Sequence, residues 1–386
     1  MKPECPDLLI FEPQIAGHRL TWLQYITEDF LDFGYRVTLA LDLRTEAEKI
    51  IRENLSPLCS RITMMSVFDE HGRWRGGSKI KSMAECKAIS QARHVFVNEL
   101  DDVASSVLRR AALGIYPPPS LKGYLNGIYF RPRFLSEPAW PPGNMIKGSG
   151  FRRLCEQGWF KHIYLVDEYL ISSQTNHNHL FHFLPDVWSG DYSCPSSDAR
   201  KALDIPPDKF VFLQYGIGNR RKGLHLVISA MTKMMPDSGC FLLCAGQIED
   251  HLAKKIVLLE KKGVAKLMNR YVSDEEERLA FGAADVVLLP YVDHYGSSGV
   301  LSRAAAAGKM VIASDAGLLA KRVREHGLGL LFKMNNARAL QNSMVKAVLL
   351  NNESRSEIQR NALRYASTCS REEFRQSLVS PWGPVK

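Results

Sequence analysis

The 386-residue chain lacks any run of about 20 consecutive apolar residues, which a membrane-spanning helix requires. Its first residues, MKPECPDLLIFEP, are interrupted by proline and acidic side chains and so do not resemble a secretory signal. The eight cysteines are scattered, and none form a Cys-x-x-Cys pair. Free thiols in a reducing compartment are the expected state for such cysteines. These absences predict a cytoplasmic protein without structural disulfides.

Two binding motifs are also missing. The chain has no Gly-x-Gly-x-x-Gly dinucleotide fingerprint, and no basic run is interleaved with aromatic residues as in RNA-binding domains. Nucleic acid is therefore not expected as a partner. The chain is nevertheless basic, with 50 Lys and Arg against 41 Asp and Glu and a net charge of +9. This balance favours an anionic partner such as a nucleotide or an anionic membrane surface, although a mildly basic solvated surface also accounts for it.

Apolar segments of strand length alternate with segments of helical periodicity in the first half. A short apolar strand at 8–11 leads into a glycine-containing loop at 13–17. Apolar residues then recur at helical spacing over 18–33, Gly34 ends that helix, and a β-branched strand follows at 35–41. This order is typical of the opening of a Rossmann-like domain.

The second half repeats the same plan after a polar, turn-rich segment at 185–197. We therefore predict an α/β fold with two doubly wound domains that face a central cleft. The expected boundaries are 1–190 for the first domain and 200–352 for the second. A C-terminal helical segment at 353–386 is expected to pack back toward the first domain.

Two further segments of the first half are ambiguous. The segment 114–150 is rich in proline, glycine and aromatic residues, and it is expected to be a long loop. Its Arg131, Arg133 and Lys147 are candidate contacts for an acceptor or a membrane surface. The histidines of NHNHLFHF (His177, His179 and His182) have spacings that suit a metal, but their alternation with apolar residues also describes a half-buried strand. No metal site is predicted.

Two loops of the second half carry the features of a phosphate site. The loop 216–223 contains Arg220, Arg221 and Lys222 between glycines. The loop that ends in Gly296–Ser297–Ser298–Gly299 opens an alanine-rich helix with small residues, which leave backbone N–H groups accessible. In a parallel sheet both loops follow strand ends on the same edge. A diphosphate needs such cations and oriented dipoles, whereas an ordinary charged turn beside an ordinary strand–helix turn is the simpler interpretation.

The second half resembles the group-1 (family 4) glycosyltransferases, which have the GT-B fold. The motifs agree in order, and the resemblance covers most of residues 8–26 and 200–335. In the first domain it is looser and lies in AGHRLTWLQYITEDFLDFGYRVTLA. The segments that carry the resemblance are FVFLQYGIGNRRKGLHLVISAM, FLLCAGQ, NRYVSDEEE, AADVVLLPY and GSSGVLSRAAAAGKMVIASDAG.

The resemblance implies a retaining, metal-independent, hexosyltransferase-like enzyme. The second domain would bind a UDP- or GDP-sugar, without a further cofactor, and the first would supply the acceptor, a hydroxyl of a glycan, a lipid or a small molecule. Lys222 matches the family lysine, and Arg220 or Arg221 would join it at the diphosphate, together with the backbone of Ser297, Ser298 and Gly299. Tyr271 and Val272 would contact the base.

The same resemblance exposes a departure. The family's paired glutamates, spaced Glu-x7-Glu, fall on Tyr295 and Arg303. The first normally contacts the donor sugar and the second the ribose. Arginine has no acceptor for ribose hydroxyls, but it can pair with phosphate. Asp293 and His294 are candidates to replace the first glutamate at the sugar.

Three residues remain as candidates for catalysis: His18, Glu99 and Asp293. His18 lies in the first-domain loop, where it would contact the donor phosphate or the acceptor hydroxyl, or would simply pack at the helix start. Glu99 and its neighbour Asp101 follow a strand end and are candidate acceptor contacts, although Asp at a helix start is usually a cap. Loss of both family glutamates also fits a non-catalytic nucleotide-sugar-binding scaffold subunit. A sugar-nucleotide epimerase on a similar fold is the remaining alternative.

Overall fold

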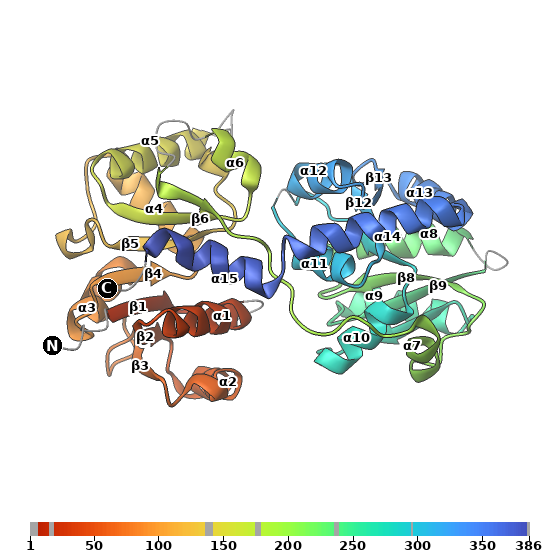
Figure 1. Ribbon diagram of the computed structural model, residues 1–386, viewed down its shortest axis with the longest axis horizontal. Helices are drawn as coiled ribbons and strands as arrows, with labels where there is room; N and C mark the ends of the chain where they lie inside the picture. The colour runs from red at the N-terminus through yellow and green to blue at the C-terminus, as the bar shows by residue number, and fades with distance from the viewer. Residues whose placement is uncertain are drawn as a thin grey trace. The chain divides into compact units, whose positions relative to one another are not determined.

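The computed structural model describes residues 7–14, 19–135, 142–173, 179–234, 239–294 and 296–383. The chain divides into two compact units (Figure 1). Unit 1 comprises Met1–Leu184 and Phe374–Lys386, and unit 2 comprises Pro185–Glu373. Within the described ranges, no helix is long and apolar enough to span a bilayer.

Unit 1 is built on a parallel sheet of seven strands in the order β3-β2-β1-β4-β5-β6-β7. Its central strands are apolar on both faces, as parallel strands covered by helices must be. The strands are β1 (Asp7–Glu12), β2 (Arg36–Leu41), β3 (Ile62–Ser66), β4 (His94–Val97), β5 (Leu125–Tyr129), β6 (Phe160–Leu165) and β7 (Phe181–Phe183). The helices between them are α1 (Arg19–Asp32), α2 (Thr45–Asn54), α3 (Lys79–Ile89), α4 (Asp101–Ala112), α5 (Pro142–Glu156) and α6 (Glu168–Ser173).

Unit 2 repeats this topology with six parallel strands in the order β10-β9-β8-β11-β12-β13. The predicted doubly wound α/β fold is thus confirmed in both halves. The strands are β8 (Phe210–Tyr215), β9 (Cys240–Ala245), β10 (Ala265–Met268), β11 (Val286–Leu289), β12 (Met310–Ser314) and β13 (Gly329–Phe332). The helices are α7 (Ser196–Ala202), α8 (Leu224–Met234), α9 (Asp250–Glu260), α10 (Asp274–Ala283), α11 (Gly299–Ala306), α12 (Gly317–Glu325), α13 (Ala337–Leu349) and α14 (Asn352–Ser367).

The expectation of one long loop over 114–150 is wrong. The segment contains strand β5 and most of helix α5, and its glycines serve close packing. A Cβ on Gly127 would lie 2.4 Å from the carbonyl oxygen of Val97 on the neighbouring strand, and a Cβ on Gly150 would lie 1.8 Å from that of Leu108 on α4. Glycine is therefore required by tertiary contacts at positions where it lowers local strand and helix propensity.

The C-terminal helical segment expected from residue 353 onward contains two helices, α14 and α15 (Arg371–Val379). At the break, the backbone of Cys369 accepts a hydrogen bond from Trp188 N at 3.2 Å. From Phe374 onward the tail belongs to unit 1. Phe374 is fully buried, and Trp382 packs edge-on against Phe30 and donates through Nε1 to the Tyr164 hydroxyl at 2.8 Å.

Candidate functional site

The sheet of unit 2 reverses its winding between β8 and β11, which are hydrogen-bonded neighbours. The chain leaves β8 toward β9 and leaves β11 toward β12. Ligands of open α/β sheets bind beyond the carboxyl ends of the two strands at such a switch point. The two loops that the sequence predicts to hold phosphate are the loops that follow these strands.

Backbone contacts join the two loops directly. Val292 N donates to the carbonyl oxygen of Arg221 at 2.8 Å. Gly223 has a φ of +72°, and a Cβ there would lie 1.8 Å from the carbonyl oxygen of Pro290. Only glycine therefore allows this approach, both for its left-handed backbone and for the space it leaves.

The cations of the basic loop differ in their surroundings. The Nζ of Lys222 lies 3.8 Å from the ring centroid of Tyr291, a cation–π contact that orients the ammonium group over the second loop. Arg221 Nη1 lies 3.3 Å from Nδ1 of His294. Arg220 is exposed, and its side chain makes no hydrogen bond to other described residues. Lys222 and Arg221 thus face the second loop, whereas Arg220 is solvated.

Helix α11 starts without a side-chain cap. Ser298 occupies the N-cap position, but its Oγ lies 3.0 Å from the Tyr291 hydroxyl and does not bond the helix backbone. Ser297 Oγ donates to Asp186 Oδ2 at 2.6 Å and accepts from Nη1 of the buried Arg322 at 2.9 Å. Leu301 N donates to the carbonyl oxygen of Ser298 at 2.9 Å, so the N–H groups of Gly299 and Val300 are the ones left for an anion, which the helix dipole also favours.

The positions expected at the donor sugar are only partly described. His294 has Nε2 at 2.9 Å from the carbonyl oxygen of Ser297, so it braces the helix start. Asp293 is exposed with a φ of +51°, at the tip of the same loop. Tyr295 lies outside the described residues.

Arg303 points back into unit 2, where it pairs with a carboxylate. Its Nε donates to Glu277 Oε1 at 3.0 Å, and its Nη1 donates to the carbonyl oxygen of Gly299 at 3.1 Å. Glu277 also accepts hydrogen bonds from the hydroxyls of Tyr192 and Tyr215. Burial, reinforced by the charge of Glu277, raises the pKa of both tyrosines, so both hydroxyls stay protonated as donors.

The expected base contacts follow β10. Tyr271 is 83% exposed, and Val272 is half-buried beside the unit 2 core. Ser273 then caps α10 and forms a capping box with Glu276, as its sequence predicts. Tyr271 lies near enough to Tyr215 to contribute to the raised pKa of that hydroxyl, after burial and Glu277.

Unit 1 has an acidic cluster at its own switch point, between β1 and β4. Arg19 pairs with Glu12 at 3.0 Å, Glu99 at 2.7 Å and Asp102 at 2.8 Å, so three carboxylates surround one guanidinium group. Burial raises the pKa of Glu12, and it raises the pKa of Glu99 to about 7 against the pull of Arg19. A pKa of about 7 means that protonated and ionised Glu99 coexist near neutral pH.

The other unit 1 candidates lie elsewhere or outside the described ranges. Asp101 accepts from the backbone N–H groups of Phe130 at 2.7 Å and Arg131 at 3.2 Å, so it organises the turn after β5. His18 and His177 lie outside the described residues. His182 belongs to β7, with Nε2 at 3.0 Å from Nδ1 of His162. Within the described part of the chain, no three His, Cys, Asp or Glu side chains gather as a metal site would require.

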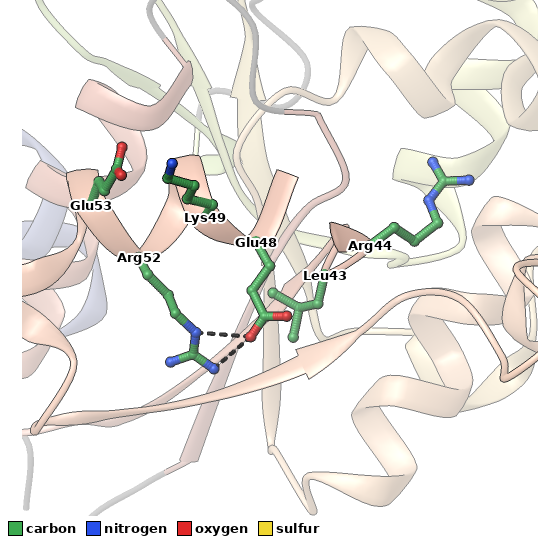
Figure 2. Close-up of a pocket in the computed structure, with 6 residues that line it drawn as sticks. All are labelled: Leu43, Arg44, Glu48, Lys49, Arg52 and Glu53. Carbon is green, nitrogen blue, oxygen red and sulfur yellow. Dashed lines mark hydrogen bonds and ion pairs between the residues drawn. The ribbon is translucent and has the colours of Figure 1, made fainter. Parts of the chain in front are cut away.

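A surface depression of unit 1 lies beside α2 (Figure 2). Both arginines that line it are paired with carboxylates. Arg52 bonds Glu48, as the dashed lines show, and Arg44 pairs with Asp42 and stacks on Phe68 at 4.1 Å. The residues that line it are Leu43, Arg44, Glu48, Lys49, Arg52 and Glu53.

Sequence reasoning missed Asp186, Tyr192, Glu277 and Arg322. Asp186 and Tyr192 fall in a polar stretch that looks like a domain boundary. Glu277 follows three acidic residues at a helix start, where helix-dipole stabilisation is a sufficient explanation. No local pattern distinguishes these residues, because their contacts come from segments far apart in sequence.

Comparison with solved structures identifies the fold class as GT-B. HepE of Anabaena in complex with UDP and glucose aligns with a TM-score of 0.68 and 15% identity over 98% of this chain and 99% of that chain. The sucrose-phosphate synthase of Thermosynechococcus elongatus has a TM-score of 0.68 and 15% identity, with 98% of each chain covered. A glycosyltransferase of Rickettsia africae has a TM-score of 0.67 and 13% identity over 99% of each chain. At these identities the similarity establishes the fold alone.

One family model matches part of the chain, within unit 2. Residues 196–365 match the family model described as Glycosyl transferases group 1. The resemblance seen in the motifs is therefore confirmed over this part of unit 2. No curated protein sequence matches the chain.

Proposed function

We propose that the protein is a retaining glycosyltransferase that uses a UDP- or GDP-sugar as donor. The observation that carries this proposal is the uncapped start of α11, which lies beside Lys222 at the switch point of a group-1 glycosyl transferase domain. HepE, which shares the fold, was crystallised with UDP and with UDP-glucose, and this supports a nucleotide-sugar donor.

The chemistry proposed for unit 2 is stabilisation of the leaving diphosphate. Cleavage of the anomeric bond places additional negative charge on the phosphate, and fixed positive groups lower the barrier most when they are oriented beforehand. Lys222, Arg221 and the first N–H groups of α11 provide such groups without a divalent metal ion. Hexosyl transfer and retention of configuration rest on the family resemblance, and activity that persists in excess EDTA tests the metal independence.

Unit 1 is proposed to bind the acceptor, a hydroxyl of a glycan, a lipid or a small molecule. Glu99 is the proposed base, because its raised pKa lets it take a proton near pH 7 and its place at the β1–β4 switch point is where a ligand of this unit would bind. His18 and Asp293 remain candidates for contacts to the acceptor or the donor sugar.

Contact with an anionic membrane surface is a further part of the proposal. The tightly packed helices α4 and α5 carry basic residues and exposed apolar ones, including Met145, which is 61% exposed, and Leu113 just after α4, which is 77% exposed. Such a combination favours anionic bilayers. Sedimentation with vesicles that contain phosphatidylglycerol, compared with neutral vesicles, tests this part.

A non-catalytic nucleotide-sugar-binding subunit is the second candidate. It is favoured by the absence of a carboxylate at position 303, where the arginine is engaged by Glu277. Turnover separates the candidates. An enzyme releases or transfers sugar from the bound donor, whereas a scaffold binds the donor and leaves it intact.

The direct test is calorimetry with UDP, GDP and their glucose and mannose conjugates. We expect Lys222→Ala to abolish detectable binding, because the diphosphate loses its oriented cation. Lys261→Ala, an exposed lysine after α9, is the matched control and should bind as the wild type does. Unchanged affinity of Lys222→Ala for every nucleotide would show that the donor site lies elsewhere.

A further inference from the structure

We propose that Glu277, held by Arg303 and two tyrosines, binds the ribose hydroxyls of the donor nucleotide and makes the site selective for ribonucleotides over deoxyribonucleotides. This inference rests on the proposed function and specifies which part of the donor the cluster recognises.

The cluster lies at the switch point of unit 2. Tyr215 is the last residue of β8, and Arg303 lies in α11, the helix that follows β11. Glu277 reaches this edge from α10, and Tyr192 reaches it from the segment that precedes α7. Four separate segments therefore converge on one carboxylate at the edge of the sheet where ligands bind.

The carboxylate is held firmly but not saturated. Oε1 accepts from the Tyr192 hydroxyl and from Nε of Arg303, and Oε2 accepts from the Tyr215 hydroxyl. A carboxylate offers about four acceptor positions, so one remains, on Oε2. The Glu277 side chain is 17% exposed, and thus a ligand can approach it.

The exposed side of the cluster matches a vicinal diol. One hydroxyl of the diol can donate to the open position of Oε2. A second can donate to the oxygen of Tyr215, because the proton of Tyr215 is already used in its hydrogen bond to Glu277. Burial and the charge of Glu277 keep that proton on Tyr215 by raising its pKa. The Nη2 of Arg303, which bonds no other described residue, remains available as a donor.

The order of contacts agrees with the order of groups in a nucleotide. Arg303 links Glu277 to the carbonyl oxygen of Gly299, the first residue of the helix whose start is proposed to bind phosphate. On the other side, Tyr215 is near Tyr271, the expected base contact. The cluster therefore lies between the phosphate and base positions, where the ribose of a bound nucleotide must lie.

The competing explanation is that the cluster only ties α10, α11 and the segment around Tyr192 together. Both explanations predict that loss of Glu277 lowers stability. Only the ribose proposal predicts that the folded protein distinguishes a ribose from a deoxyribose, so nucleotide selectivity, and not stability, is the informative measurement.

The experiment compares UDP with 2′-deoxy-UDP and 3′-deoxy-UDP by calorimetry, and uses the guanine series if GDP is the nucleotide that binds. A hydrogen bond to a charged group leads us to expect that loss of the hydroxyl that donates to Glu277 weakens binding to the wild type about 10-fold or more, whereas loss of the hydroxyl that donates to the neutral Tyr215 costs less. Glu277→Gln keeps the size of the side chain but loses its charge. In this variant the Kd values of UDP and of each deoxy form should differ by no more than about 2-fold.

Glu275→Gln is the matched control, since Glu275 is an exposed acid on the same helix that pairs with Arg278. It should keep the selectivity of the wild type. Equal binding of the ribo and deoxy forms by the wild type would overturn the inference while the proposed function stands, and this arm is decisive even if Glu277→Gln does not fold. Full selectivity in a folded Glu277→Gln would equally overturn it. If neither UDP nor GDP binds, the proposed function fails first.

Discussion

At the residue scale, two carboxylates define the electrostatics of the two units. Glu277 in unit 2 is matched by Arg303, and it accepts from two hydroxyls. Glu99 in unit 1 shares Arg19 with Glu12 and Asp102, so negative charge exceeds positive charge around it. The first arrangement suits a fixed acceptor of hydrogen bonds, and the second suits a group that gains and loses a proton.

Glu99 should make stability depend on pH. The fold raises its pKa from the 4.5 of an exposed glutamate to about 7. The folded state therefore binds the proton more tightly than the unfolded state, and ionisation costs stability as pH rises from 4.5 to 7. The free-energy cost of ionising Glu99 in the folded state is absent below pH 4.5 and reaches its full value above pH 7, roughly 3 kcal/mol at most. We expect Glu99→Gln to be more stable than the wild type at pH 8 by up to that amount, but not at pH 4, as measured by urea unfolding.

The same residue should control the pH dependence of transfer. If Glu99 acts as the base, its carboxylate is the active form, and kcat/KM should rise with an apparent pKa near 7. Glu99→Gln should lose most of the activity and this pH dependence while it retains affinity for the nucleotide. A variant with the wild-type rate and profile would remove Glu99 from the mechanism.

At the element scale, the proposed donor site depends on contact between the loops that follow β8 and β11. Gly223 makes that contact possible, because its backbone is left-handed and its Cα faces the Pro290 carbonyl group. We expect Gly223→Ala to separate the loops, abolish nucleotide binding and destabilise unit 2 by more than about 2 kcal/mol.

Gly263→Ala is the control for Gly223→Ala. Gly263 has the same φ of +72°, but no atom lies within 4 Å of its added Cβ. The free energy of unfolding of this variant should fall only by the cost of placing alanine in a left-handed backbone conformation, about 1 kcal/mol. The variant should bind nucleotide normally. Thermal melting measures the loss of stability and calorimetry the loss of nucleotide affinity. Equal losses in the two variants would show that the loop contact has no special role.

Elements with their own apolar pattern could be predicted from sequence, and elements shaped by close packing could not. The strands of unit 2 and the start of α10 follow directly from apolar runs and a capping box. Strand β5 and helix α5 could not be predicted because they contain Gly127 and Gly150, which lower local propensity. Glycine is required at these positions by close contacts with Val97 and Leu108. Propensity is a local quantity, whereas the need for glycine at those positions is a tertiary one.

In the candidate site, too, some features could be predicted from the sequence and others depend on tertiary packing. The arrangement of Lys222 beside the start of α11 follows from two loops on one edge of a parallel sheet, and the sequence predicts it. The pairing of Arg303 with Glu277 could not be predicted, because it depends on how α10 and α11 pack. The resemblance assigns a glutamate to position 303, so its arginine suggests a lost contact, and only the structure shows the carboxylate of Glu277 beside it.

At the scale of the whole molecule, the chain consists of two units with the same winding and different charge at their switch points. The tail from Phe374 packs within unit 1, where Trp382 contacts Phe30, Tyr35 and His94. Every described residue of the proposed donor site belongs to unit 2.

This division predicts that damage to the core of unit 1 leaves nucleotide binding intact. Trp382→Ala removes a large buried ring and its hydrogen bond to Tyr164, and it should destabilise unit 1 by about 3 kcal/mol or more. The affinity for the nucleotide at a temperature where the variant remains folded should equal that of the wild type. A large loss of affinity would place part of the donor site outside unit 2.

The most direct test of the central claim is a crystal structure of the complex with UDP or GDP. We expect phosphate oxygens to accept hydrogen bonds from the first backbone N–H groups of α11 and to lie within ion-pair distance of Lys222 Nζ. A nucleotide bound elsewhere, or one whose phosphates contact neither group, would contradict it.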